Sequence, residues 1–204
     1  MTFETWAAFA AASMVLLLIP GPTVLLVLSY ALSRGRRVAV STALGVATGD
    51  LIALSLSLAG LGALVAASAT AFTVLKWVGA IYLVWLGIKL LRAPADAGLP
   101  SPGEARGTFR HAAVVTALNP KSVAFFVAFV PQFIDPARPL LPQAAILTAT
   151  FVGLAGLNSL AYALAADRLR ARIARPRVLS ILQKAGGATL IGMGALLALS
   201  RRTA

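Results

Sequence analysis

Two side chains of opposite charge lie deep inside apolar segments. A charge in such a place usually has an oppositely charged partner or serves the protein's function. Asp50 stands about 12 residues into the run 38–66, and Lys121 about 9 residues into the run 112–133, or roughly 18 and 14 Å at 1.5 Å per helical residue. A charge at the centre of a membrane helix costs at least about 2.5 kcal/mol, so such residues usually face a protein interior and mark a pathway. The pair indicates a substrate or proton pathway. A purely structural ion pair is the alternative.

A break in the first apolar run lies at a comparable depth. Pro20, Gly21 and Pro22 interrupt it, because each proline lacks a backbone donor and glycine loosens the joint. The hydroxyl of Thr23, which follows, can satisfy freed backbone groups. An ordinary proline kink would leave the same pattern.

A second break is expected in the run 112–133. Asn119 followed by Pro120 has the chemistry of an N-cap and a first helical residue, and predicts a new half-helix that begins in mid-span. The N-terminus of a half-helix carries partial positive charge that suits a carboxylate. The two breaks therefore indicate a transport site. Asp50 and Lys121 lie at similar depths and could pair with each other there.

Asn158 is a further polar residue within an apolar run. It could be the counterpart of Asp50 in the second half of the chain, or it could make an interhelical hydrogen bond.

The elements that must position these residues are six apolar segments. The chain is 59% hydrophobic and only 12% charged, with a mean hydropathy of +0.89. A helix of about 20 apolar residues crosses a bilayer, and the sequence predicts spans at 5–32, 38–66, 71–91, 112–133, 140–166 and 178–200. The fold class is thus an all-α polytopic membrane protein with six transmembrane helices.

The chain divides into two halves of three spans. Residues 1–91 form the first half, the proline- and glycine-rich stretch 92–110 a loop, and residues 111–204 the second half. An odd number of spans per half makes the second half enter the membrane in the opposite sense. This predicts a 3+3 inverted repeat within one membrane domain.

Basic residues predict the orientation. Thirteen of the 18 Lys and Arg residues fall in or beside the first, third and fifth connections, which are therefore expected in the cytoplasm with both termini outside. The net charge of +12 is thus a topology signal, and nucleic-acid binding is not expected.

Several chemistries have no residues to support them. The chain has no cysteine and a single histidine, His111, so neither a thiolate nor a histidine-rich metal centre is expected. It has no GxxxxGK[ST] phosphate-binding motif and no catalytic set, so we expect neither an enzyme nor a cofactor.

The same residues resemble those of the LysE/RhtB family of amino-acid exporters. The matching motifs run in order along nearly the whole chain: PGP at 20–22, GRR at 35–37, Gly45 with Gly49 and Asp50, GAIYLVWLG at 79–87, NPKSVAFFVAFVPQF at 119–133 and the glycines of 186–194. Ala39 and Ala112 depart from the family pattern, where glycine is frequent, and both exchanges are small for small.

The resemblance implies a six-helix exporter driven by the proton gradient, in a bacterial cytoplasmic (inner) membrane. The implied cargo is an amino acid such as homoserine, threonine, leucine or lysine. Asp50 and the two breaks would lie in or near the translocation site. With an amino acid as cargo, we expect both breaks to hold its carboxylate, and Asp50 to hold its ammonium group or exchange it for a proton. Lys121 would pair with Asp50 or with that carboxylate. Small-residue faces permit a homodimer. The alternative is a channel, or a non-transporting membrane subunit with a structural Asp50–Lys121 pair.

Overall fold

The computed structural model describes residues 1–19, 21–67, 69–92, 107–173 and 176–199. Pro20 and most of the predicted loop at 92–110 lie outside the described residues. Within them, all regular structure is helical, which confirms the all-α class. The helices are α1 (Phe3–Leu18), α2 (Pro22–Arg34), α3 (Ala39–Ala67), α4 (Ala69–Leu91), α5 (Thr108–Ala117), α6 (Pro120–Ala128), α7 (Leu140–Ile173) and α8 (Pro176–Leu199), with short 3₁₀ turns η1 (Gly35–Val38) and η3 (Val130–Phe133).

Both predicted interruptions separate two helices. The axes of α1 and α2 differ by 56°, and those of α5 and α6, the latter continued to Phe133, by 46°. Ile19 and Asn119 each precede a proline and adopt extended backbone, because the proline ring disfavours the helical region for the residue before it. Pro22 and Pro120 then begin the next helix, where a missing N–H has no consequence.

The helix boundaries agree closely with the predicted segments, with one clear difference. The fifth segment was predicted to end at residue 166, but α7 continues to Ile173. Arginine is a good helix former, so the helix extends past its apolar part into the basic sequence.

Two of the described helical stretches, Ala39–Gly60 and Leu140–Ala166, are each long and apolar enough to cross a membrane. Each bent pair would add one span, which gives up to four within the described residues.

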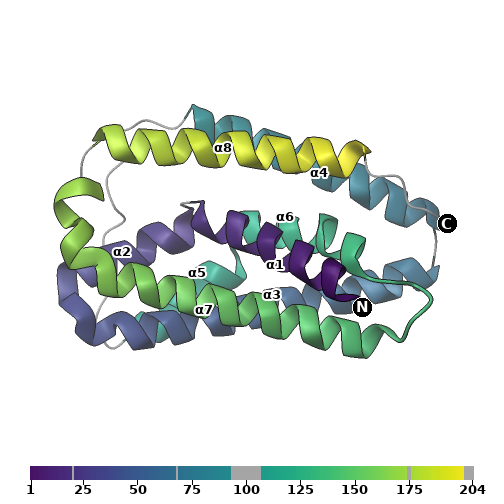
Figure 1. Ribbon diagram of the computed structural model, residues 1–204, viewed down its shortest axis with the longest axis horizontal. Coiled ribbons are helices and arrows are strands. Elements are labelled where there is room, and N and C mark those ends of the chain that lie inside the picture. Colours follow the sequence, from purple (N-terminus) through teal and green to yellow (C-terminus); the bar gives the residue numbers. More distant parts are fainter. Residues whose placement is uncertain (20, 68, 93–106, 174–175, 200–204) are drawn as a thin grey trace.

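The helices form two groups that lie alongside each other. Figure 1 shows α4 and α8 side by side along one edge, with the other helices below them. The beginning of α1 and the end of α8 lie at the same end of the molecule, and α2, α4 and α7 end at the opposite one.

Glycines allow the closest helix contacts. A Cβ at Gly49 of α3 would lie 2.5 Å from the carbonyl oxygen of Ala113 on α5, so only glycine fits there. Gly87 of α4 and Gly187 of α8 meet reciprocally, because a Cβ on either would lie 2.6 Å from the other's carbonyl oxygen. Gly45, four residues before Gly49, makes the same kind of close contact with α5, as small residues do where membrane helices approach each other.

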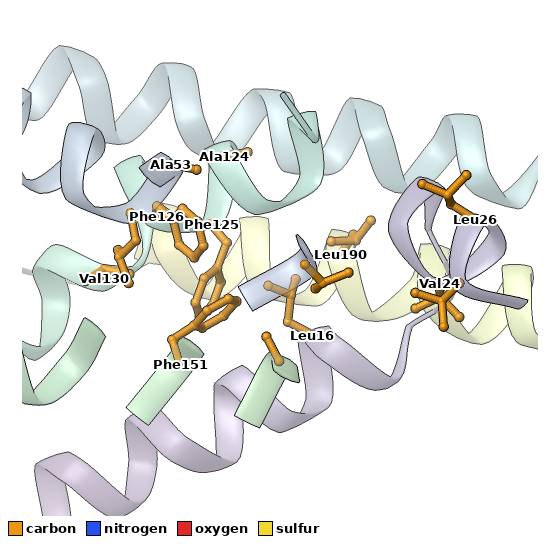
Figure 2. Packing of buried hydrophobic residues seen from close by; sticks show 14 of the residues in the cluster. Leu16, Val24, Leu26, Ala53, Ala124, Phe125, Phe126, Val130, Phe151 and Leu190 are labelled. Atoms are coloured by element: carbon orange, nitrogen blue, oxygen red, sulfur yellow. The ribbon is translucent and has the colours of Figure 1, made fainter. Parts of the chain in front are cut away.

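Aromatic rings fill the core beneath the second break. Phe125 and Phe126 of α6 both pack on Phe151 of α7, with ring centroids 5.9 and 4.7 Å apart. Figure 2 shows these rings pointing toward one another, with Leu16 of α1 nearby. This packing holds α6 against α1 and α7, and thereby sets the position of Lys121 at the start of α6.

Candidate functional site

The last carbonyl oxygens of α1 meet the ammonium group of Lys121. Nζ of Lys121 donates to the carbonyl oxygen of Leu16 at 3.0 Å and to that of Ile19 at 2.8 Å. The lysine side chain is only 7% exposed. The C-terminal end of a helix carries partial negative charge, so an ammonium group there is favourable by up to about 2 kcal/mol.

Two side chains of α7 satisfy the carbonyl oxygens in between. Asn158 Nδ2 donates to Leu17 at 3.2 Å, and the Tyr162 hydroxyl donates to Leu18 at 3.4 Å. The four oxygens of residues 16–19, here named the α1 carbonyl end, therefore all accept hydrogen bonds from side chains more than 100 residues away. The Leu16 oxygen also accepts the backbone N–H of Ile19 at 3.2 Å, but each of the other three would otherwise cost several kcal/mol inside a bilayer.

Asn119 connects the two breaks. Its Oδ1 accepts a hydrogen bond from the Lys121 backbone N–H at 3.1 Å, which is the predicted N-cap of α6. Its Nδ2 donates to Thr23 Oγ1 at 3.0 Å, and the Thr23 hydroxyl also meets that of Thr116 at 3.3 Å. The start of α2 is thereby joined to the α5–α6 break.

The N-terminus of α2 has no such cap. Gly21 is the N-cap residue, and no side chain accepts a hydrogen bond from the first turn. The first intrahelical bond runs from Leu25 N to Gly21 O, which leaves the amides of Thr23 and Val24 without intrahelical acceptors. Gly21 lies against Lys121, because a Cβ there would be 3.4 Å from Lys121 Nζ. An uncapped, positively polarised helix end thus lies beside a buried ammonium group.

Asp50 is buried in the interior at 2% exposure. Its charge interacts with that of Lys121, and Ser122 lies beside it, yet Oδ1 has no hydrogen-bond partner. A buried carboxylate oxygen without a partner is expensive to maintain and favours a role in binding a cation or a proton.

The direct Asp50–Lys121 ion pair that the sequence predicts is not formed. No salt bridge within 4.0 Å joins these two described residues, because the ammonium group is taken by the α1 carbonyl end. Asn158, which could have been a counterpart of Asp50, instead makes the interhelical hydrogen bond to Leu17.

The predicted residues otherwise gather around the two breaks. Gly21, Thr23, Asn119 and Lys121 are linked by the contacts described above, whereas Pro20 lies outside the described residues. Pro22 and Pro120 shape the backbone and are themselves exposed. Within the described ranges, no three His, Asp or Glu side chains come together in a way that could hold a metal ion.

Sequence reasoning missed Tyr162 and Thr116. Tyr162 stands four residues after Asn158, and therefore on the same face of α7, which is a signal that could have identified it. Thr116 stands three residues before Asn119 and is hidden in an apolar run without a comparable signal.

A cavity of about 410 Å³ lies on the other side of the α5–α6 break, against α4. Its lining is apolar and includes Tyr82, Leu118 and Pro120, but neither Asp50 nor Lys121. Leu118 is 74% exposed, so this hollow belongs to the outer surface of the helix bundle. The hydrogen-bonded groups at the breaks, and not this cavity, form the candidate site.

Comparisons with a protein-family model and with individual known proteins both identify transport proteins. The family model described as LysE type translocator matches residues 14–201. A homoserine/homoserine lactone efflux protein of Salmonella typhimurium is 39% identical over 98% of this chain and 99% of its own length. A leucine efflux protein of Salmonella choleraesuis is 35% identical over 61% of this chain and 60% of its own. No solved structure matches the chain significantly.

Proposed function

Because this chain belongs to the LysE family of translocators, we propose that it exports amino acids from the cell by proton antiport. The full-length similarity to a homoserine/homoserine lactone efflux protein favours small neutral amino acids of the homoserine type, with leucine as a second class. The chain is a membrane protein, and the bacterial cytoplasmic (inner) membrane is its proposed location.

The observation that carries this proposal is the arrangement around Lys121. An amino acid has an ammonium and a carboxylate group a few ångströms apart, and the site offers a complement to each. Asp50, with its unpartnered Oδ1, would hold the substrate ammonium group. The amides of Thr23 and Val24 at the start of α2, which have no acceptor within that helix, would hold the carboxylate.

The two half-helix ends would have different roles. At α6, the Asn119 side chain already occupies the Lys121 amide, whereas α2 is uncapped. The carboxylate therefore belongs mainly at α2, and Asn119 and Pro120 position Lys121. Two of the three Nζ protons of Lys121 go to the α1 carbonyl end, and the third is available for the substrate carboxylate at Gly21.

Exchange at Asp50 would couple export to the proton gradient. A carboxylate holds either an ammonium group or a proton, but not both, so release of substrate would accompany protonation. Each cycle would thereby move one proton inward for each amino acid outward.

We further propose six spans in a 3+3 inverted repeat within a single membrane domain. Two observations support this proposal: the breaks at 21–22 and 119–120 are in the first span of each half, and the reciprocal contact of Gly87 with Gly187 has the form of a two-fold contact between the halves. Both termini would lie outside, since the ends of α2, α4 and α7 share one side of the molecule with the basic connections.

A homodimer would have to use faces other than the tightest glycine contacts. Gly45, Gly49, Gly87 and Gly187 are occupied within the chain, whereas Gly153 and Gly192 have nothing within 4 Å.

No observation favours the alternative of a channel or a non-transporting subunit. That subunit would keep its two deep charges as a mutual pair, and the pair is not formed.

The test is accumulation of radiolabelled amino acids in inside-out vesicles under an imposed pH gradient. Homoserine and leucine should accumulate, and the accumulation should collapse when the gradient is dissipated. A lack of accumulation of all twenty amino acids and of homoserine would overturn the proposal.

A further inference from the structure

The α1 carbonyl end offers the oxygen ligands of a cation site, and a side chain of the same protein occupies that site. Lys121 Nζ contacts two carbonyl oxygens, those of Leu16 and Ile19, at 3.0 and 2.8 Å. Carbonyl oxygens at an interrupted membrane helix are the groups with which secondary transporters coordinate co-transported cations. Here the protein's own ammonium group takes that position.

We propose that the α1 carbonyl end is a binding site for a small monovalent cation whose resident ion is the Lys121 ammonium group. A chain without this ammonium group would bind a small primary ammonium ion at the same carbonyl oxygens. In the native chain the tethered cation makes an external one unnecessary, so this site adds no Na⁺ or K⁺ requirement.

The surroundings explain why the site prefers a cation with N–H donors. The oxygens of Leu17 and Leu18 are satisfied by Asn158 and Tyr162, and that of Leu16 also accepts the Ile19 backbone N–H at 3.2 Å, so the oxygen of Ile19 depends most on the ion. Two oxygens are too few for a Na⁺ ion, which needs a fuller shell, but they suit two hydrogen bonds from one ammonium group. The Asp50 carboxylate, whose charge interacts with that of Lys121, adds long-range attraction for a positive charge.

The space that the Lys121 side chain occupies also suits a small primary ammonium ion. Lys121 is only 7% exposed, and Gly21 lies against the end of its side chain. Truncation of Lys121 to alanine would leave a narrow slot lined by the α1 carbonyl end and Gly21. Ethylammonium has the length and the N–H donors to replace the missing part of the lysine side chain.

The test is thermal unfolding of purified Lys121→Ala in detergent, titrated with ethylammonium chloride. A ligand that binds only the folded state should raise the melting temperature by about 3–5 °C for each tenfold increase above its Kd. Tetramethylammonium, which has the charge but no N–H donor, is the matched control at equal ionic strength, and NaCl is the second. Only ethylammonium should stabilise Lys121→Ala, and it should leave the native chain and Lys121→Met unchanged, because a side chain fills the slot in both.

Equal effects of ethylammonium and tetramethylammonium, or no effect of either, would overturn the proposal, and a larger effect of NaCl would identify a metal-ion site instead. If Lys121→Ala does not survive purification, the yield of monodisperse protein from membranes solubilised with each salt gives the same comparison. Because the readout is stability and not transport, the result stands whether or not the chain exports amino acids.

Discussion

Asn119 and Thr23 join two helix breaks that are almost 100 residues apart in the chain. The Asn119 amide donates to the Thr23 hydroxyl at 3.0 Å while its carbonyl oxygen caps α6. One side chain thus determines where α6 begins and how the uncapped start of α2 lies relative to it. The geometry of the proposed carboxylate site therefore depends on a residue that need not touch the substrate.

Asn119→Ala should destabilise the protein and weaken export together. Loss of an N-cap costs about 1 kcal/mol, which corresponds to a fall in melting temperature of about 2–4 °C for a chain of this size. Asn119→Ser is the informative control, because a serine hydroxyl can still cap α6 but is too short to reach Thr23. We expect Asn119→Ser to recover the melting temperature measured in detergent but not the export rate. Full recovery of both would mean that the link to Thr23 has no role in transport.

Asp50→Asn should abolish export driven by the pH gradient. The variant keeps the shape but loses the charge that would hold an ammonium group, and a hydrogen bond to a charged group is worth about 1.5–3 kcal/mol, or roughly 10–100-fold in affinity. Vesicle accumulation of homoserine measures the effect. Asp135→Asn is the matched control, since Asp135 is a half-exposed carboxylate paired with Arg138 at 3.1 Å outside the site. Normal gradient-driven accumulation by Asp50→Asn would eliminate Asp50 as the coupling group.

Gly49→Ala should separate α3 from α5 and reduce the yield of folded protein. The added methyl group would lie 2.5 Å from the Ala113 carbonyl oxygen and 2.7 Å from Thr116 Cβ. Because the nearest atom belongs to the backbone, the two helices would have to move apart to make room, which costs free energy. Gly153→Ala in α7 has open space around it and should be neutral or stabilising by roughly 0.5–1 kcal/mol, because alanine favours a helix. Melting temperatures in detergent compare the two. Equal stability would show that the α3–α5 contact is looser than its geometry indicates.

Single cysteines should report the membrane orientation without background, because the chain has none of its own. Phe109 is 44% exposed near the start of α5, and Ala137 is exposed between η3 and α7. With both termini outside, Ala137→Cys in intact cells should react with a membrane-impermeant maleimide and Phe109→Cys should not. Inside-out vesicles should give the reverse pattern. The opposite labelling in both preparations would invert the proposed topology.

The amino-acid sequence by itself determined the local features of this protein. The helical segments, the two breaks and the N-cap at Asn119 follow from apolar runs, from prolines that bar helix in the preceding residue, and from a side chain that bonds two residues away. The burial of Asp50 also followed, because a charge in an apolar run has to face the protein.

Only the tertiary structure decided how the charged and polar groups are paired. Lys121 was expected to meet Asp50, but it reaches the α1 carbonyl end, and Asn158 and Tyr162 complete that arrangement. These partners are more than 100 residues apart, so no local pattern relates them. Their choice depends on how α6 and α7 pack against α1, because this packing places the carbonyl oxygens of Leu16 and Ile19 within hydrogen-bond distance of the ammonium group.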